Sequence, residues 1–140
     1  PVDGYTEEHL REAFETNVIS AMMLSSVAVP HLEKTEGSII FIGSTHTRRA
    51  FPGASPYATT KAALEGLTKV MAAELGPRKI RVNAIRPGMV GTEGTHAAGI
   101  EESEMQKQTL AATPLGRLGK PDDIASAAVF LRAPFGVDHG

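Results

Sequence analysis

The chain contains no cysteine, and this absence excludes several kinds of site at once. A disulfide framework, a cysteine nucleophile and a thiolate zinc site all need that residue. No apolar run approaches the roughly 18 residues that span a bilayer, and no basic segment followed by an apolar stretch opens the chain. The sequence therefore predicts neither a membrane span nor a secretory signal, and we expect a cytoplasmic protein.

An excess of charge of one sign is also lacking, because 14 basic side chains oppose 16 acidic ones and the net charge is −2. Nucleic-acid-binding domains usually carry clustered Lys and Arg, so we expect no nucleic-acid partner. The five histidines show no spacing typical of metal ligands, and we expect no metal site. Hydrophobic residues make up 41% of the 140 positions, a share typical of one globular domain.

Apolar and turn residues predict alternating helices and strands. Apolar residues recur every four positions after Thr6, which favours a long helix with Thr6 as its N-cap. Two short runs rich in β-branched residues favour buried strands. Ser55 as a cap and Pro56 in the first turn favour the start of a helix, and Gly76-Pro77 favours its end after Leu75. The expected elements in order are a helix at 6–33, a strand at 38–43, a helix at 55–75, a strand at 80–85, a short helix at 101–111 and a last helix from 120.

This alternation predicts an α/β fold with a parallel sheet. The ligands of such sheets bind beyond the carboxyl ends of the strands. In this chain those ends lead into the segments that begin at Ser44 and at Pro87. Both segments are therefore candidate parts of a functional site.

Three side chains near the first strand end are candidates for proton chemistry. Tyr57 and Lys61 lie four positions apart, so they share one helix face. A nearby ammonium ion and the positive helix N-terminus both favour an ionised phenol, which can then act as a general acid or base. The hydroxyl of Ser44 can hydrogen-bond a substrate oxygen and Tyr57 together. A surface Tyr–Lys pair and an ordinary turn serine are the alternative interpretations.

The order and spacing of these residues resemble the short-chain dehydrogenase/reductases, most of all the 3-oxoacyl-carrier-protein reductases and the sugar or secondary-alcohol dehydrogenases. The match runs in the correct order over nearly the whole chain. The elements that carry it are Asn17, Ile39-Ile-Phe-Ile-Gly-Ser44, the thirteen-residue interval to Tyr57, Tyr57-Ala-Thr-Thr-Lys61, Leu75-Gly-Pro77, Arg81-Val-Asn83-Ala84, Pro87-Gly-Met-Val90-Gly-Thr92 and Pro114-Leu-Gly-Arg-Leu-Gly-Lys-Pro-Asp-Asp-Ile124.

The resemblance implies the C-terminal part of a Rossmann-type doubly wound parallel sheet, and an NAD(P)-dependent oxidoreductase that interconverts a carbonyl compound and a secondary alcohol. It implies that Tyr57 exchanges the proton, that Lys61 promotes its ionisation, and that Ser44 orients the substrate oxygen. Asn17 would hold a water molecule in a proton relay towards Lys61. The residues implied to bind the NAD or NADP cofactor are Tyr57, Lys61, Pro87, Gly88, Val90 and Thr92.

Parts of the family pattern are missing at both ends of the sequence. The Gly-rich phosphate loop and the residue that selects NAD or NADP do not occur, so we expect residues 1–140 to form a single partial Rossmann-type domain without its N-terminal nucleotide-binding half. Without that half we expect weak dinucleotide binding and uncovered sheet edges. In the family, a loop and a last strand follow the position of Leu131. The corresponding segment is shorter here, which argues against that strand.

A non-catalytic alternative is a truncated product that serves as an oligomerisation module. The resemblance implies dimers or tetramers built on the two long helices, where Ala21, Met22, Ala62 and Met71 suit close packing. A Gly-rich segment upstream in the coding DNA would favour the enzyme over this alternative.

Two loops have both a functional and a structural interpretation. His46, Arg48 and Arg49 would border the substrate pocket and attract an anionic group, or would form an ordinary solvated loop. The Gly91–Gly99 stretch is either a lid that closes on substrate or a surface loop.

Overall fold

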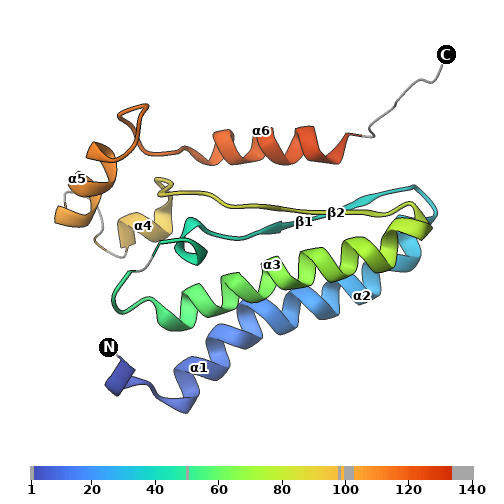
Figure 1. Cartoon of the computed structure of the whole chain (residues 1–140), viewed down its shortest axis with the longest axis horizontal. Helices are drawn as coiled ribbons and strands as arrows, with labels where there is room; N and C mark the ends of the chain where they lie inside the picture. The colour runs from blue at the N-terminus through green and yellow to red at the C-terminus, as the bar shows by residue number, and fades with distance from the viewer. Residues whose placement is uncertain (1, 50, 98, 100–102, 134–140) are drawn as a thin grey trace.

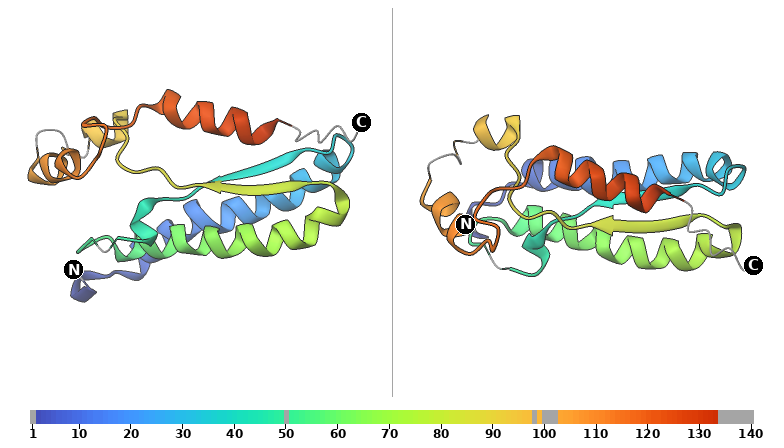
Figure 2. Two further views of the ribbon diagram at one scale, coloured as in Figure 1. Left: turned by 45° about the horizontal axis from the view of Figure 1, so that its top comes forward. Right: turned by 90° about the horizontal axis from the view of Figure 1, so that it is seen from above.

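A two-stranded parallel sheet lies between two helical layers in the computed structural model, which describes residues 2–49, 51–97, 99 and 103–133 (Figure 1). The helices α2 (Ser20–Glu33) and α3 (Ser55–Leu75) cover one face, and α6 (Pro121–Arg132) covers the other, as Figure 2 shows. The helix α1 (Glu7–Phe14) continues the first layer beside the start of α3. The predicted α/β class with a parallel sheet is therefore confirmed. Within the described part of the chain, no helix combines the length and apolar character needed to cross a bilayer.

The helix predicted from Thr6 onward forms, but a π-helical segment, Glu15–Ile19, interrupts it. A short 3₁₀ turn, Val2–Gly4, precedes it, and the Thr6 side chain caps α1 by accepting a hydrogen bond from the backbone N–H of His9 at 3.2 Å. Pro30 lies inside α2, which ends one turn later. The π-helical segment changes the direction in which successive side chains leave the helix. Asn17 faces α3 there and donates a hydrogen bond to Thr60.

The strands β1 (Ser38–Ile42) and β2 (Arg81–Ile85) pair in parallel, with Ser38 opposite Arg81 and Ile42 opposite Ile85. Their carboxyl ends therefore meet at one edge of the sheet. A 3₁₀ turn, Gly76–Arg78, follows α3 where the sequence predicted that this helix stops.

The hydrophobic core lies between α3 and the sheet. Buried side chains from the helix, Leu64 and Leu75, pack against Phe41 of β1 and against Ile80 and Val82 around β2. Ile80 is only 1% exposed. This packing holds α3 against both strands and thereby fixes the first turns of the helix beside the strand ends.

Three short helices lie beyond or beside the carboxyl ends of the strands: the 3₁₀ turn Thr45–Thr47, α4 (Glu93–Ala97) and α5 (Glu104–Ala111). The chain then returns through α6 along the opposite face of the sheet (Figure 2). This return brings the first turns of α6 close to the segment that follows β2, where Val90 and Gly119 form an isolated parallel bridge.

Some boundaries differ from the predicted ones. Ala54 is the N-cap of α3 and Ser55 is the first helical residue, so the predicted cap by Ser55 is wrong. The Gly91–Gly99 stretch contains α4 rather than irregular backbone alone. The short helix predicted from residue 101 begins at Glu104, and its predicted first residues lie outside the described ones, as does the segment 134–140 for which no last strand was expected.

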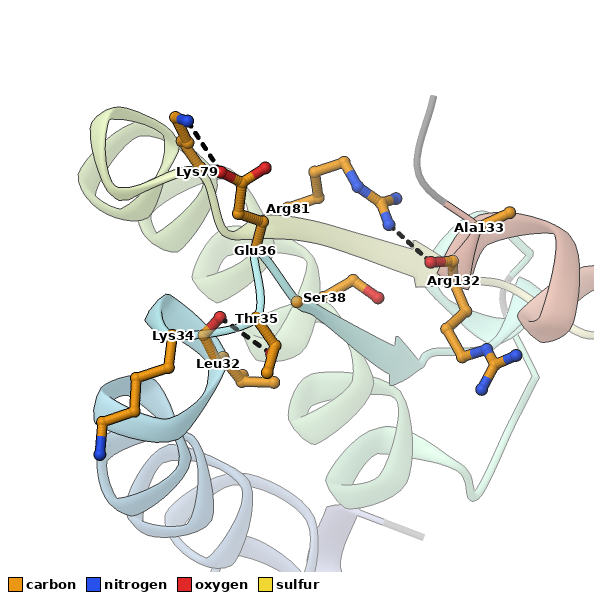
Figure 3. A pocket seen from close by; sticks show the side chains of 10 residues that line it. Leu32, Lys34, Thr35, Glu36, Ser38, Lys79, Arg81, Arg132 and Ala133 are labelled. Carbon is orange, nitrogen blue, oxygen red and sulfur yellow. Dashed lines mark hydrogen bonds and ion pairs between the residues drawn. The ribbon is translucent and has the colours of Figure 1, made fainter. Parts of the chain in front are cut away.

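Arg81, the first residue of β2, forms hydrogen bonds with the end of α6. Its guanidinium donates a hydrogen bond to the carbonyl oxygen of Leu131. It donates another to that of Arg132 at 2.8 Å (Figure 3). Carbonyls at a helix C-terminus lack partners within the helix and carry a partial negative charge, so a cation there is favourable.

We expect Arg81→Leu to lower the free energy of unfolding by about 1–3 kcal/mol, because charged hydrogen bonds to α6 are lost. Denaturant unfolding followed by circular dichroism measures this change. Arg11→Leu is the control, since the described ion-pair partner of Arg11 is exposed Glu7 on the same helix and the loss of this pair should matter less. Equal effects of the two substitutions would contradict the conclusion that Arg81 stabilises the contact between α6 and β2.

Candidate active site

A cavity of about 680 Å³ opens beyond the carboxyl ends of β1 and β2. Its walls come from the loop after β1, the first turns of α3, the loop after β2 and the inner side of α6. Most of the lining is apolar, including Met89, Val90, Met105 and Ile124. The polar side chains that line it are Ser44, His46, Tyr57, Lys61, Thr92 and Thr95.

Tyr57 and Lys61 both reach this cavity from α3, as their spacing predicted. The Lys61 Nζ donates a hydrogen bond to the carbonyl oxygen of Ile42 at 2.9 Å and lies 5.6 Å from the centre of the Tyr57 ring. Burial lowers the pKa of Lys61, because desolvation disfavours the charged form. The ammonium group is thus anchored at the end of β1, beside the phenol.

Ser44 is buried at the end of β1, and its hydroxyl interacts with His46. The Ser44 Oγ accepts a hydrogen bond from the backbone N–H of His46 at 3.2 Å and lies 3.1 Å from the His46 Nδ1. Among the described residues the partner of this hydroxyl is therefore His46, and not Tyr57 as the sequence predicted. The reason is local, because the 3₁₀ turn after Ser44 folds His46 back over the strand end.

The His46 ring is held between two other rings. It stacks on Phe51 with centroids 4.2 Å apart, and it meets the Tyr57 ring edge-on at 5.5 Å. Desolvation in this position lowers the pKa of His46. The loop after β1 is thereby packed against the start of α3, which keeps Ser44 and Tyr57 on the same cavity.

Asn17 lies behind the cavity and does not line it. Its Nδ2 donates a hydrogen bond to the Thr60 Oγ1 at 3.1 Å, and the Thr60 hydroxyl donates to the carbonyl oxygen of Tyr57 at 2.8 Å. Thr60 is completely buried. The π-helical segment is thus connected to α3 directly before Lys61, and such segments are frequent at functional sites.

The loop after β2 is fixed by the segment that leads into α6. Gly119 N donates to the carbonyl oxygen of Met89 at 2.9 Å, and Gly91 N donates to that of Gly119 at 3.0 Å. This pairing turns the backbone N–H and carbonyl of Val90 away from Gly119. A Cβ at Gly119 would lie 3.2 Å from the Val90 Cγ2, so the close approach favours glycine. On its other side, the Val90 carbonyl accepts from the Thr95 hydroxyl at 3.3 Å.

The structure brings most of the predicted site residues to this one cavity. Asn17 is the exception, and its contact runs through Thr60 instead. The sequence missed Thr95, Met105 and the inner residues of α6, which carry no local pattern that marks them. The predicted residues that line the cavity are Ser44, Tyr57, Lys61, Pro87, Gly88, Val90 and Thr92.

The basic residues of the loop after β1 behave differently from one another. His46 lines the cavity, whereas Arg48 and Arg49 do not. Arg48 instead contributes, after the Thr47 hydroxyl and Arg86, to the lowered pKa of Glu65 on α3. The predicted attraction of an anionic group therefore finds no support from these two arginines. No cluster of three possible metal-ligating side chains occurs among the described residues.

A larger hollow of about 940 Å³ lies at the opposite end of the sheet, where both strands begin (Figure 3). Of the charged groups that line it, Lys79 pairs with Glu36 at 2.7 Å, and Arg81 binds the end of α6. Ligands of parallel α/β sheets bind at the carboxyl ends of the strands, so we place the candidate active site in the smaller cavity.

Known proteins resemble this chain in sequence. A family profile described as enoyl-(acyl carrier protein) reductase matches residues 1–135. An uncharacterized oxidoreductase of Methylorubrum extorquens is 48% identical over 130 residues, which cover 93% of this chain and 52% of that protein. The 7α-hydroxysteroid dehydrogenase of Escherichia coli is 39% identical over 125 residues, which cover 89% of this chain and 48% of that protein. The chain therefore spans about half the length of the curated relatives that it matches.

Solved structures share the fold over nearly all of the chain. Gluconate 5-dehydrogenase of Burkholderia cenocepacia, in complex with NADP and tartrate, gives a TM-score of 0.87 at 29% identity and covers 95% of this chain and 52% of that one. A 4-hydroxyisoleucine dehydrogenase complexed with NADH gives 0.84 at 30% identity, with 94% and 54% covered. The similarity thus includes both layers of helices and the paired strands between them.

Proposed function

Because the chain belongs to the short-chain dehydrogenase/reductase family, we propose that the protein containing it is an NAD(P)-dependent oxidoreductase. The reaction interconverts a carbonyl compound and a secondary alcohol by hydride transfer. The observation that carries this proposal is the presence of Tyr57, Lys61 and Ser44 on one largely apolar cavity. A proton donor, a cation and a hydroxyl in such a cavity suit a reaction in which a carbonyl oxygen gains a proton.

Tyr57 acts as the general acid and base in this proposal. In the reducing direction, its hydroxyl gives a proton to the substrate oxygen as hydride reaches the carbon. In the oxidising direction, the phenolate takes the proton from the alcohol. The Lys61 ammonium stabilises the phenolate, and the Ser44 hydroxyl donates a hydrogen bond that holds the substrate oxygen beside Tyr57.

The residues on the cavity wall fit a nicotinamide, which when bound supplies or accepts the hydride. The backbone N–H and carbonyl of Val90 offer a donor and an acceptor that match the carboxamide. Pro87 and Gly88 shape the turn before Val90, Thr92 lies beside it, and Lys61 binds ribose hydroxyls. Structural neighbours bind NADP or NADH, which supports a nicotinamide cofactor without choosing between NAD and NADP.

Asn17 holds a water molecule in a proton relay towards Lys61 in this proposal. Two observations support such a position: the π-helical segment around Asn17 and its contact with Thr60, the residue before Lys61.

The proposed assembly is a homodimer or homotetramer that covers the outer side of α2. Met22, Met23 and Val27 are between about half and two-thirds exposed there, an apolar surface that favours association. Ala21 and Met71, which the sequence placed in the interface, instead pack against the chain's own core. The interface would therefore use a neighbouring stripe of α2.

Transfer of deuterium tests the proposed reaction directly. With reduced cofactor deuterated at both C4 positions, we expect the protein containing this chain to form secondary alcohols with deuterium on the carbinol carbon. The substrates are a ketone panel that includes cyclohexanone and ethyl acetoacetate, and mass spectrometry detects the label. Heat-denatured protein is the control. A protein that binds the cofactor but labels no alcohol would support the inactive oligomerisation module instead.

A further inference from the structure

His46 contacts both residues that would handle the substrate oxygen. Its Nδ1 lies 3.1 Å from the Ser44 Oγ, and its ring lies edge-on to Tyr57 with centroids 5.5 Å apart. Stacking on Phe51 at 4.2 Å fixes the plane of the ring. A histidine held by two rings and a backbone turn has little freedom to leave the serine.

The Ser44 hydroxyl has one hydrogen to donate, and His46 competes for it. The backbone N–H of His46 already donates to the Ser44 Oγ at 3.2 Å. When Nδ1 carries no hydrogen, it accepts from the hydroxyl, and Ser44 then offers the substrate only an acceptor. When Nδ1 carries a hydrogen, it donates to Oγ, and the hydroxyl hydrogen is free for the substrate.

We propose that His46 is a positioning residue that sets the direction of the Ser44 hydroxyl hydrogen, and thereby selects between the carbonyl and the alcohol form of the substrate. This inference rests on the proposed function, in which Ser44 binds the substrate oxygen. A carbonyl oxygen only accepts hydrogen bonds, so it needs the free hydroxyl hydrogen. An alcohol also donates, so it pairs with a Ser44 oxygen whose hydrogen points to His46.

The selection depends on pH, because imidazolium carries a hydrogen on both ring nitrogens. Protonation of His46 therefore favours the carbonyl form, and neutral His46 with its hydrogen on Nε2 favours the alcohol form. Desolvation lowers the pKa of His46 below that of an exposed histidine, so this change falls on the acidic side of the usual range. The titratable or charged groups on the surrounding elements are Tyr57, Lys61 and Glu65 on α3, Arg48 on the same turn, and Arg86 after β2.

Equilibrium binding in Tyr57→Phe tests the selection with the proposed proton donor removed. With cofactor bound, affinities for cyclohexanone and cyclohexanol are measured between about pH 5 and 8. As the pH falls, we expect cyclohexanone to bind more tightly and cyclohexanol more weakly, with a change of about tenfold in their ratio, the equivalent of one hydrogen bond. In Tyr57→Phe/His46→Asn the ratio should not change with pH, because the amide reaches Ser44 but does not titrate.

Two further variants separate positioning from packing. With Tyr57 intact, His46→Asn should keep kcat within about threefold of wild type, whereas His46→Leu should lower it about tenfold, since only asparagine can still bond to Ser44. His9→Asn is the control, because His9 is exposed on α1 and should leave every value unchanged.

A pH-dependent ratio that survives in Tyr57→Phe/His46→Asn would overturn the role of His46, as would equal kcat values for His46→Asn and His46→Leu. A wild-type kcat in Tyr57→Phe would instead contradict the proposed function. The comparison of His46→Asn with His46→Leu would still decide whether His46 positions Ser44, so the two failures are distinguishable.

Discussion

Tyr57→Phe is expected to lower kcat by about a hundredfold to ten-thousandfold, the range that a positioned general acid or base contributes. The substitution removes only the hydroxyl, and the ring keeps its edge-on contact with His46. The Tyr57 side chain is 42% exposed, so no buried space is left behind. We therefore expect thermal unfolding and cofactor affinity to stay close to wild type, while initial rates of ketone reduction measured by NAD(P)H absorbance fall.

The chain's other tyrosine, Tyr5, provides the matched control. It lies before α1 and is 40% exposed, so Tyr5→Phe makes the same chemical change at a comparable exposure away from the cavity. Its kcat should equal that of wild type. A folded Tyr57→Phe protein with wild-type kcat would show that another group supplies the proton, and the assignment of Tyr57 would be wrong.

Lys61→Met is expected to lower kcat about a hundredfold near neutral pH, the lower end of the range that one group stabilising transition-state charge contributes. The ammonium lies 5.6 Å from the centre of the phenol ring. A cation in this position stabilises the negative charge that develops on the phenol oxygen during proton transfer.

The charge of Lys61 itself is lost at lower pH than that of an exposed lysine, because burial lowers its pKa. Lys61 therefore stabilises negative charge on Tyr57 only at pH values at which its own amine is still protonated. Rates of alcohol oxidation across a pH series measure the decline that follows the loss of this charge in the wild type. Lys61→Arg, which keeps its charge, should lack this decline, and Lys69→Met, on the exposed side of the same helix, should keep the wild-type profile. A wild-type kcat in Lys61→Met near neutral pH would contradict the proposed electrostatic role.

Local sequence signals predicted the elements that carry the candidate site. Pro56 near the start and Gly76 after the end bounded α3 correctly, because proline suits a first helical turn and Gly76-Pro77 stops the helix. The four-residue spacing of Tyr57 and Lys61 placed both on one helix face. Parallel strands then required that Ser44 and the loop after β2 lie at the same edge of the sheet.

Contacts between distant segments could not be predicted in the same way. Asn17 in the π-helical segment donates a hydrogen bond to Thr60, which is 43 positions away in sequence. The orientation of the Val90 backbone depends on its bridge to Gly119. The sequence placed His46 either at the substrate pocket, where it would attract an anionic group, or in a solvated loop. Two residues of spacing from Ser44 do not reveal whether a turn folds the ring back onto the hydroxyl.

Periodicity, turn residues and helix-bounding residues determined the α/β class, the order of the elements and the face of α3 on which the phenol and the amine lie. These are local consequences of backbone geometry, and each is encoded within a few neighbouring positions. The tertiary structure alone decided which side chain bonds to the Ser44 hydroxyl, which residues of α6 line the cavity, and where the π-helical segment interrupts the helix before β1. Such contacts depend on packing between segments that lie far apart in the chain, and local sequence patterns do not specify that packing.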